Sequence, residues 1–354
     1  MYKDKYFHLI DLGSSKVRFS VFDKDLGEKF SKTRSIKFDY NYTNQFKVID
    51  QIIKEAEKKI SSHVNDIILL LDSPEIFTID ISFIKYIDKK IKINDMVDSL
   101  MLELKQLILS NYNNCHILHI IFNNFIVDGQ SSNEWPKNKY VNNNLKIDFK
   151  VICLPKKLVI KVKDKFIENN LNIVNIFCTS YLKSLSYLRK LQLKKISFLD
   201  IGWERTTLMF YEKNKLHFIS SVPIGSYHIT KDISKIFKIS EEDAEKIKFL
   251  FNNSSTEFSY EVNPIDNSTA LRDIMTKNIS IDILKKVILY RIEDIIDLIF
   301  KKSNIKSYHH NLSDSELFLI GEGSILFNNN SFYLDDKFEF SSISFYKEKD
   351  TAVS

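Results

Sequence analysis

The placement of glycine constrains this chain most, because the sequence has only 7 glycines in 354 residues. Five of them follow apolar, strand-like runs in three places: Gly13, then Gly202 with Gly225, then Gly321 with Gly323. A chain this poor in glycine keeps it where the backbone turns sharply or lets something approach closely. Asp-x-Gly follows such a run twice, at Asp11 and Asp200, which suggests two turns that clamp phosphates and a metal ion.

Composition narrows the class of protein. Hydrophobic residues at 44% and charged residues at 27% are typical of a soluble globular protein, and the length allows two domains. The net charge of +5 is small and the lysines are spread along the chain, so we expect no nucleic-acid partner. No apolar run reaches bilayer length, and the N-terminus lacks a signal-peptide pattern. We expect Cys115, Cys153 and Cys178 to be reduced core residues of a cytosolic protein.

Hydrophobic periodicity predicts strands that alternate with helices. In the first 74 residues it predicts strands at 6–12, 16–22, about 35–38 and 66–71, and a helix over about 44–61. Residues 75–151 look like an insertion with its own core: strands at 76–81, 116–122, 125–127 and 145–153, and a helix after Asn94. The remainder predicts helices at 156–169, 180–191, 226–237, 241–251 and 279–302, and strands at 173–177, 195–201, 206–211, 216–222 and 316–320.

The first candidate site is the turn after Asp11. Backbone N–H groups of Gly13, Ser14 and Ser15 can cradle a phosphate, and Lys16 adds a positive charge. Asp11, at the strand end, can hold a magnesium ion through water. The alternative is a β-hairpin turn without a ligand.

Two further turns are candidates. Asp200-Ile201-Gly202 repeats the first pattern, and Thr206 and Thr207 point to opposite faces of the next strand, so one of them can reach a cleft. The alternative for Asp200 is a strand-end cap. Gly321-Glu322-Gly323 lies between a strand and a probable short helix, where two glycines permit close approach of an adenine or a phosphate. The alternative there is a flexible lead-in to a helix N-terminus.

A charged helix supplies the last pair of candidates. Glu245 and Lys248 are three residues apart, so they share a helix face and can hydrogen-bond a ribose. The alternative is a solvated surface. No Cys/His cluster has zinc spacing, and neither a serine-hydrolase nor a P-loop motif occurs.

Taken in order along nearly the whole chain, these segments resemble the actin/Hsp70 superfamily and, more narrowly, the bacterial cell-division FtsA family. Residues 11–16 resemble the first phosphate loop of that family, and residues 118–129 resemble a stretch of its inserted subdomain. Residues 222–226, 229–233 and 243–248 resemble the stretch after its second phosphate loop. The inserted block together with the 222–248 run is the specific part, because the single motifs occur in many ATPases.

The resemblance implies an α/β, actin-like fold: two domains of duplicated, ribonuclease H-like construction, with an inserted α+β subdomain of the SHS2 type. It implies subdomain 1A at residues 1–74 and 152–194, the insertion (1C) at 75–151, and the second domain (2A and 2B) at 195–354, with 2B at about 227–305.

The same resemblance implies Mg²⁺ and ATP as ligands. It places Asp11 and Asp200 at the magnesium ion and the nucleophilic water. It places the phosphate at Gly13, Ser14, Ser15, Lys16, Gly202 and Thr206, the ribose at Glu245 and Lys248, and the adenosine at Gly321 and Gly323. Arg291, on the long helix, falls where the family contacts the C-terminal tail of the tubulin-like protein FtsZ.

The function implied is an actin-like filament on the cytoplasmic face of the inner membrane, which tethers FtsZ there at the division site. The inserted subdomain is expected to contact late division proteins. The family ends in an amphipathic membrane-binding helix, whereas this sequence ends at Ser354, so either the sequence is truncated or its attachment differs.

The sequence departs from the family in two loops. The second loop reads Trp203-Glu204-Arg205 where the family has glycines, and Glu322 replaces a glycine in the adenosine loop. Bulky side chains crowd a phosphate and Glu204 repels one, although Arg205 can supply compensating charge. We therefore expect ATP affinity to be weak, altered or lost, and at most a weak ATPase activity.

Two rival functions remain open at this point. One is a pilus-assembly scaffold similar to PilM, also actin-like with an inserted subdomain, which would recruit the N-terminus of a pilus protein. The other is a small-molecule kinase of the same superfamily, which we rank low because the sequence shows no acceptor-pocket acid or substrate motif.

Overall fold

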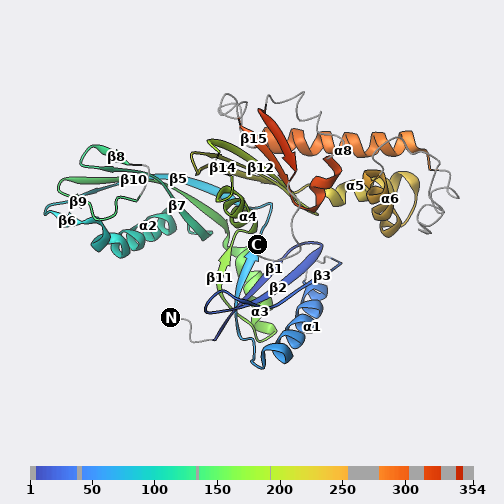
Figure 1. Cartoon of the computed structure of the whole chain (residues 1–354), viewed down its shortest axis with the longest axis horizontal. Helices are drawn as coiled ribbons and strands as arrows, with labels where there is room; N and C mark the ends of the chain where they lie inside the picture. The colour runs from blue at the N-terminus through green and yellow to red at the C-terminus, as the bar shows by residue number, and fades with distance from the viewer. Residues whose placement is uncertain are drawn as a thin grey trace. The chain divides into compact units, whose positions relative to one another are not determined.

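The structure is a computed structural model that describes residues 5–37, 42–132, 135–191, 193–253, 279–302, 315–327 and 340–345 (Figure 1). The described residues form two compact units, the first mainly from residues up to Lys190 and the second mainly from Leu191 onward. No helix of the described part is long and apolar enough to cross a membrane.

The first unit contains a five-stranded sheet in the order β11-β4-β1-β2-β3. Its strands are β1 (Tyr6–Leu12), β2 (Lys16–Asp23), β3 (Glu28–Ser35), β4 (Asp66–Leu71) and β11 (Asn172–Phe177). The helices of this part are α1 (Thr43–Ile60), α3 (Lys156–Glu168) and α4 (Thr179–Leu188). Helix α1 packs on β2 and β3 through one apolar stripe, which includes Ile49, Ile52 and Ala56.

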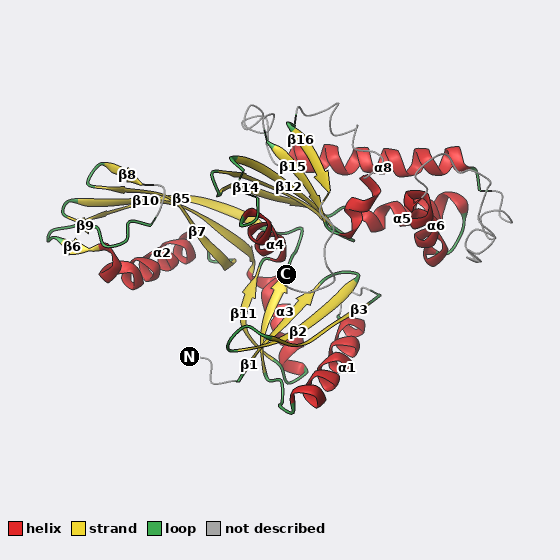
Figure 2. Ribbon diagram, in the orientation of Figure 1, coloured by secondary structure: helices red, strands yellow, loops and turns green. Residues whose placement is uncertain are grey.

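The first unit also contains the insertion, a second sheet in the order β5-β10-β7-β8 (Figure 2). Its strands are β5 (Phe77–Tyr86), β7 (Cys115–Val127), β8 (Gln130–Ser132) and β10 (Asn144–Pro155). A short ribbon of β6 (Ile91–Lys92) and β9 (Tyr140–Val141), the 3₁₀ turn η1 (Ile93–Met96) and helix α2 (Val97–Asn111) complete it. Its separate core joins Leu100, Leu104 and Ile108 of α2 to the inward side chains of the sheet.

The second unit repeats the order of the first five-stranded sheet, as β14-β13-β12-β15-β16. Its strands are β12 (Lys195–Ile201), β13 (Thr206–Glu212), β14 (Lys215–Val222), β15 (Glu316–Ile320) and β16 (Ser342–Phe345). Its helices are α5 (Ser226–Phe237), α6 (Glu241–Asn253) and α8 (Ile281–Lys302), and the 3₁₀ turn η3 (Glu322–Phe327) follows β15.

The pairing pattern is duplicated as well as the strand order. Strand β1 is antiparallel to β2 and parallel to β4, which in turn is parallel to β11. Strand β12 is antiparallel to β13 and parallel to β15, which is parallel to β16. The predicted internal duplication around the two Asp-x-Gly turns is therefore confirmed, and so is an α/β fold with two related sheets.

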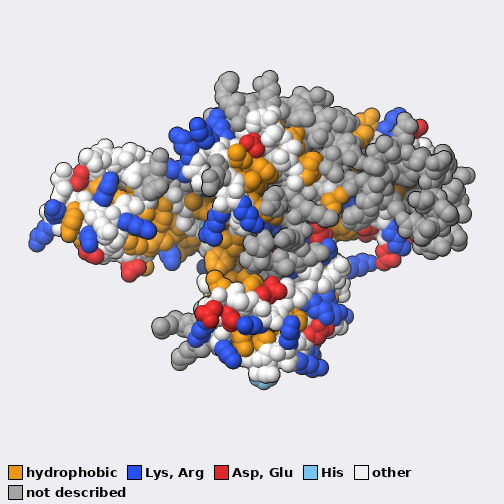
Figure 3. Space-filling model, in the orientation of Figure 1, with side chains coloured by type: hydrophobic (Ala, Val, Ile, Leu, Met, Phe, Trp, Pro, Cys, Tyr) orange, Lys and Arg blue, Asp and Glu red, His pale blue; other side chains and the backbone are white. Residues whose placement is uncertain are grey.

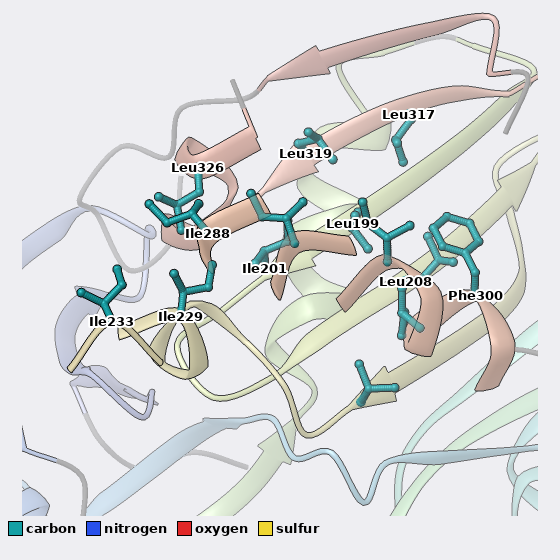
Figure 4. Packing of buried hydrophobic residues seen from close by; sticks show 14 of the residues in the cluster. Leu199, Ile201, Leu208, Ile229, Ile233, Ile288, Phe300, Leu317, Leu319 and Leu326 are labelled. Atoms are coloured by element: carbon teal, nitrogen blue, oxygen red, sulfur yellow. The ribbon is translucent and has the colours of Figure 1, made fainter. Parts of the chain in front are cut away.

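The core of the second unit connects its sheet to its helices (Figure 4). Leu199, Ile201 and Leu208 project from β12 and β13 towards Ile229 of α5 and Ile288 of α8, and all five side chains are buried. Alternation along the strands and the i, i+3, i+4 spacing along α8 are what place these side chains on facing surfaces. This core anchors the loops that leave β12 and β15.

Two sequence predictions about strands were wrong, and one strand was missed. The strand expected near 35–38 is β3, which ends at Ser35; its residues are mostly polar and only Phe30 is buried, so alternation could not reveal it. The two strands expected at 116–122 and 125–127 are one strand, β7, which passes through Asn123 and Asn124 with a register shift. Strand β16 was not predicted, because it is short and largely solvated.

All three cysteines are buried and free of disulfides, as predicted. The face of the molecule seen in Figure 3 carries basic and acidic side chains interspersed over the described surface. No single basic stripe is visible among the described side chains on that face.

Candidate functional site

The first Asp-x-Gly turn is a tight connection between β1 and β2. The Gly13 N–H donates to the carbonyl of Lys16 at 3.0 Å, and the Ser15 carbonyl accepts from Ile36 at 2.8 Å. Ser14 and Lys16 are half-buried beside it. The structure thus brings the four predicted phosphate residues, Gly13, Ser14, Ser15 and Lys16, into one hairpin turn.

Asp11 lies on β1 directly opposite Arg18 of β2. Its Oδ2 is 3.1 Å from Nη1 of Arg18, and the hydroxyl of Thr179 lies 3.5 Å from its Oδ1. Both charged side chains are largely buried, at 7% and 13% exposure. The Asp11 carboxylate is therefore already matched by a cation of this chain, a partner that the sequence reading did not identify.

The second turn has the same construction. The Gly202 N–H donates to the carbonyl of Arg205 at 2.8 Å, as Gly13 does to Lys16. Asp200 is 2% exposed, and its Oδ2 is 3.8 Å from Nη2 of Arg205. Arg205 thus lies close to the Asp200 carboxylate, and its expected role as a compensating charge for a phosphate stays a prediction.

The threonines of β13 are both buried rather than split between core and cleft. The Thr206 hydroxyl donates to the carbonyl of Ile224 at 2.8 Å, and the Thr207 hydroxyl donates to Ser221 Oγ at 3.1 Å. Thr206, a predicted phosphate contact, therefore makes a hydrogen bond that ties β13 to the segment before α5.

The N-terminus of α5 is tied to the second turn. Ser226 N–H donates to the Gly202 carbonyl at 3.0 Å, and Tyr227 N–H donates to the Trp203 carbonyl at 2.8 Å. A Cβ at Gly225 would lie 2.5 Å from the Gly202 carbonyl oxygen, so only glycine fits there. Backbone donors of the first helical turn, which elsewhere bind anions, are used here within the chain.

The third loop packs directly on the second. Gly321 has φ +84°, and a Cβ on it would lie 2.5 Å from Asp200 Oδ1. A Cβ on Gly323 would lie 2.9 Å from the Ile201 carbonyl oxygen and 3.0 Å from Cβ of Ser226. The structure therefore brings Gly202, Gly225, Gly321 and Gly323 together near Asp200. Glu322 begins η3 and is half-buried.

The two predicted ribose-binding residues, Glu245 and Lys248, are bonded to each other and to Thr230. The Lys248 side chain on α6 is 2% exposed, and its Nζ lies 2.6 Å from Glu245 Oε2. The ammonium also donates to the Thr230 hydroxyl at 2.9 Å and to the Ser226 carbonyl at 3.2 Å. The Thr230 hydroxyl donates in turn to Glu245. Burial lowers the pKa of Lys248, an effect that the nearby Glu245 carboxylate opposes.

The Trp203 ring lies beside Lys248 of this pair. The same ring stacks on Tyr227, with centroids 5.0 Å apart and an angle of 16° between the planes. The Lys248 ammonium lies 5.0 Å from the Trp203 ring, within cation–π range. Tyr227 is held by its hydroxyl, 2.7 Å from Glu241, and by Lys231 4.3 Å from its ring centroid. The sequence showed that Trp203 is bulky but not which residues it contacts.

These contacts test the fit of a Mg²⁺–nucleotide complex to the second unit. Lys248 donates to Thr230 and Ser226 and pairs with Glu245, which also accepts from Thr230. The Trp203 indole lies 5.0 Å from the lysine ammonium. Asp200 lies near Arg205 and against the backbone of Gly321. Among the described residues, no group of three or more His, Cys, Asp or Glu side chains is arranged for a metal ion. In this arrangement the described residues of the second unit do not fit the nucleotide.

Arg291 lies on α8 and is also paired. Its Nε donates to Asp232 Oδ2 on α5 at 2.6 Å, and Nη1 donates to Asp294 at 3.2 Å. The hydrogen bond that Arg291 donates to the Asp232 carboxylate raises the pKa of Arg291. The guanidinium side chain is 26% exposed, so part of it faces solvent.

A junction that the sequence reading missed joins the insertion to the first sheet. His119 of β7 accepts a hydrogen bond from the Cys178 N–H at 2.9 Å, and the Cys178 thiol donates to Asp72 at 3.2 Å. Asp72 also accepts from the N–H and hydroxyl of Ser180 at the start of α4. Burial lowers the pKa of His119 to about 4, so the ring is neutral near pH 7.

Comparison with known proteins relates the chain to one family. The family model "Cell division protein FtsA" matches residues 197–326. Cell division protein FtsA of Helicobacter pylori is 26% identical over 146 residues, which are 41% of this chain and 29% of that protein. Cell division protein FtsA of Staphylococcus epidermidis is 22% identical over 287 residues, 75% of this chain and 60% of that protein. The chain thus spans less than two thirds of these relatives.

Among solved structures, the PilM–PilN type IV pilus biogenesis complex contains a similar chain. It matches with a TM-score of 0.60 and 14% identity, over 100% of this chain and 91% of that one. At this identity the likeness shows the fold alone. With the duplicated sheets, it supports the actin-like fold class.

Proposed function

We propose that this chain, an actin-like protein related to the cell-division protein FtsA, is a division scaffold that binds the C-terminal tail of FtsZ. The observation that carries the proposal is the FtsA family match over residues 197–326. That stretch includes the second and third glycine loops and all of α8 with Arg291. The relationship to curated FtsA proteins supports the same function.

The surface around Arg291 supports peptide binding. Arg291 and Leu298 are seven residues apart on α8, as are Ile283 and Tyr290, so these two pairs form adjacent stripes. Ile283, Tyr290 and Leu298 are exposed at 47%, 65% and 42%. A guanidinium has five N–H donors, so Arg291 can hold Asp232 and still donate to a carboxylate of a bound peptide.

The wider role extends this proposal. Copies of the chain would associate as an actin-like filament on the cytoplasmic face of the inner membrane at the division site. The inserted sheet would contact late division proteins. Mg²⁺ and ATP are the ligands that the resemblance implies, but no step of the proposed role depends on them, because the described loops of the second unit are occupied by their own side chains.

A peptide pull-down tests the proposal. The FtsZ C-terminal peptide should retain the wild-type chain, and Arg291→Glu should weaken retention by about tenfold or more, which is about 1.4 kcal/mol. Lys301→Glu makes the same charge change on α8 at a 77% exposed side chain and serves as the matched control. Absence of FtsZ-peptide binding, or equal binding by Arg291→Glu and wild type, would contradict the proposal.

The pilus-scaffold alternative has one observation in its favour, which is the fold match to the PilM–PilN complex over the whole chain. It would require the N-terminal segment of a pilus protein as partner. The same pull-down with such a peptide separates the two functions, because retention by that peptide and not by the FtsZ tail selects the pilus function.

A further inference from the structure

The second unit contains a closed set of contacts around one lysine. Lys248 has a carboxylate, a hydroxyl and a backbone carbonyl within hydrogen-bond distance, from Glu245, Thr230 and Ser226. The Trp203 ring supplies a π surface 5.0 Å from the ammonium. The Lys248 side chain is 2% exposed, and the Glu245 carboxylate balances its charge inside the protein. A ligand hydroxyl at this position would have to displace one of these partners.

Trp203 is held in place both through its backbone and through its ring. The Trp203 backbone carbonyl accepts from the Tyr227 N–H at 2.8 Å, and the indole stacks on the Tyr227 ring. The Tyr227 ring is fixed by Glu241 at its hydroxyl and by Lys231 over its ring. Backbone and ring contacts with Tyr227 thus hold Trp203 on the first turn of α5. Glu241 and Lys231 in turn restrict the rotamer freedom of Tyr227.

The backbone around the indole leaves little space for phosphate. Glycine is required at 225, 321 and 323 because other parts of this chain lie within 3.0 Å of where a Cβ would be. The chain uses these glycines to pack its own loops together. The N–H groups of Ser226 and Tyr227, at the start of α5, donate to the carbonyls of the second turn.

We propose that the Trp203 indole is a built-in occupant of the nucleotide half-site in the second unit. It takes the place beside Lys248 where the ribose of a bound nucleotide is expected, and so holds these loops together without nucleotide. The second unit then has an actin-like nucleotide half-site in which the Trp203 indole always occupies the ligand position. This inference does not depend on FtsZ binding, because it concerns the three loops and not the exposed face of α8.

The indole could instead act as a stacking surface for an adenine ring. The contacts favour the built-in occupant, since the indole already stacks on Tyr227 and already neighbours the lysine that a ribose would use. Stacking of a base on Trp203 would quench or shift its emission. That response is an outcome of the test below.

The experiment titrates Mg-ATP into the full chain. The sequence has two tryptophans, so Trp135→Phe leaves Trp203 as the only one. In this background, calorimetry measures binding, while Trp203 emission and its quenching by acrylamide report whether the indole moves. Trp203→Gly removes the indole, and Trp203→Phe is the matched control that keeps an aromatic ring.

We expect no saturable heat and no change in Trp203 emission or quenching up to millimolar Mg-ATP. Trp203→Gly, with its fold checked by circular dichroism, should bind Mg-ATP about tenfold or more tightly than wild type. Trp203→Phe should remain like wild type. Saturable binding by wild type, a Mg-ATP-dependent change in Trp203 emission, or a folded Trp203→Gly chain without improved affinity would each overturn the proposal. The emission measurement needs no substitution in the half-site, so the test stands even if Trp203→Gly does not fold.

Discussion

Gly321→Ala tests whether the third loop is pressed against Asp200 as the structure shows. Two costs arise at Gly321. Its φ of +84° is a conformation that alanine adopts poorly, and the new Cβ would lie 2.5 Å from Asp200 Oδ1 and 2.6 Å from the Ile201 carbonyl oxygen. Gly129 is the matched control, because it also has φ +84° but has no atom within 4 Å of an added Cβ.

The difference between the two substitutions isolates the packing cost. The backbone conformation alone should cost about 1–2 kcal/mol at either site. Overpacking against fixed backbone and a buried carboxylate should add about 1–3 kcal/mol at Gly321. We therefore expect a loss of unfolding free energy of about 2–5 kcal/mol for Gly321→Ala and about 1–2 kcal/mol for Gly129→Ala.

Urea unfolding followed by tryptophan emission is the assay, because each unit contains one tryptophan. Trp203 lies in the second unit and Trp135 in the insertion of the first. Gly321→Ala is compared with its parent in the Trp135→Phe background, and Gly129→Ala with its parent in the Trp203→Phe background. Each transition then reports the unit that carries the substitution. Equal losses at the two glycines, within about 0.5 kcal/mol, would refute the close packing of the third loop on Asp200.

Four further substitutions test buried titratable groups. Burial lowers the pKa of Lys248 in the folded chain below its usual 10.5. Between this lowered pKa and pH 10.5 the unfolded chain binds more protons than the folded chain, so the free energy of unfolding should rise with pH. Lys248→Met should flatten this rise, measured by urea unfolding at a series of pH values. The pKa of His119 is about 4 in the folded chain and 6.5 in the unfolded chain. The free energy of unfolding should therefore fall by up to about 3 kcal/mol as the pH drops from 6.5 to 4. His119→Gln keeps an acceptor for the Cys178 N–H and should abolish this pH dependence. Arg18→Met should destabilise the first unit by about 3–5 kcal/mol in Trp135-monitored unfolding, because it removes the Arg18 guanidinium from the buried Asp11 carboxylate. Asp11→Asn in addition should restore much of the loss, and an unchanged midpoint for Arg18→Met would argue against the pair.

Much of the fold followed from local patterns. Strands β1, β4, β12 and β15 were predicted with their observed bounds, because each is a short apolar run that ends in a turn signal. The glycines of the second unit marked loops that do meet around Asp200. Strand β3 was predicted with wrong bounds and β16 was missed, because hydrogen bonds to neighbouring strands, rather than apolar alternation, hold them in their sheets.

The candidate site was predictable in position and less so in contacts. The sequence placed Glu245 and Lys248 on one helix face, and the structure shows them bonded to each other there. That Thr230 completes the pair depends on the packing of α5 against α6, which no local pattern states. The facing of Asp11 and Asp200 across one groove stays a prediction.

The amino-acid sequence alone determines two similar sheets, an insertion within the first unit and three glycine loops at strand ends, because turn chemistry and apolar periodicity act over neighbouring residues. What fills the loops of the second unit was decided only in three dimensions. Trp203, Tyr227 and Lys248 come from a turn and two separate helices, and their contact exists only once the shared core has docked those helices on the sheet. A side chain in a binding loop can point to a ligand or to the protein, and tertiary packing makes that choice.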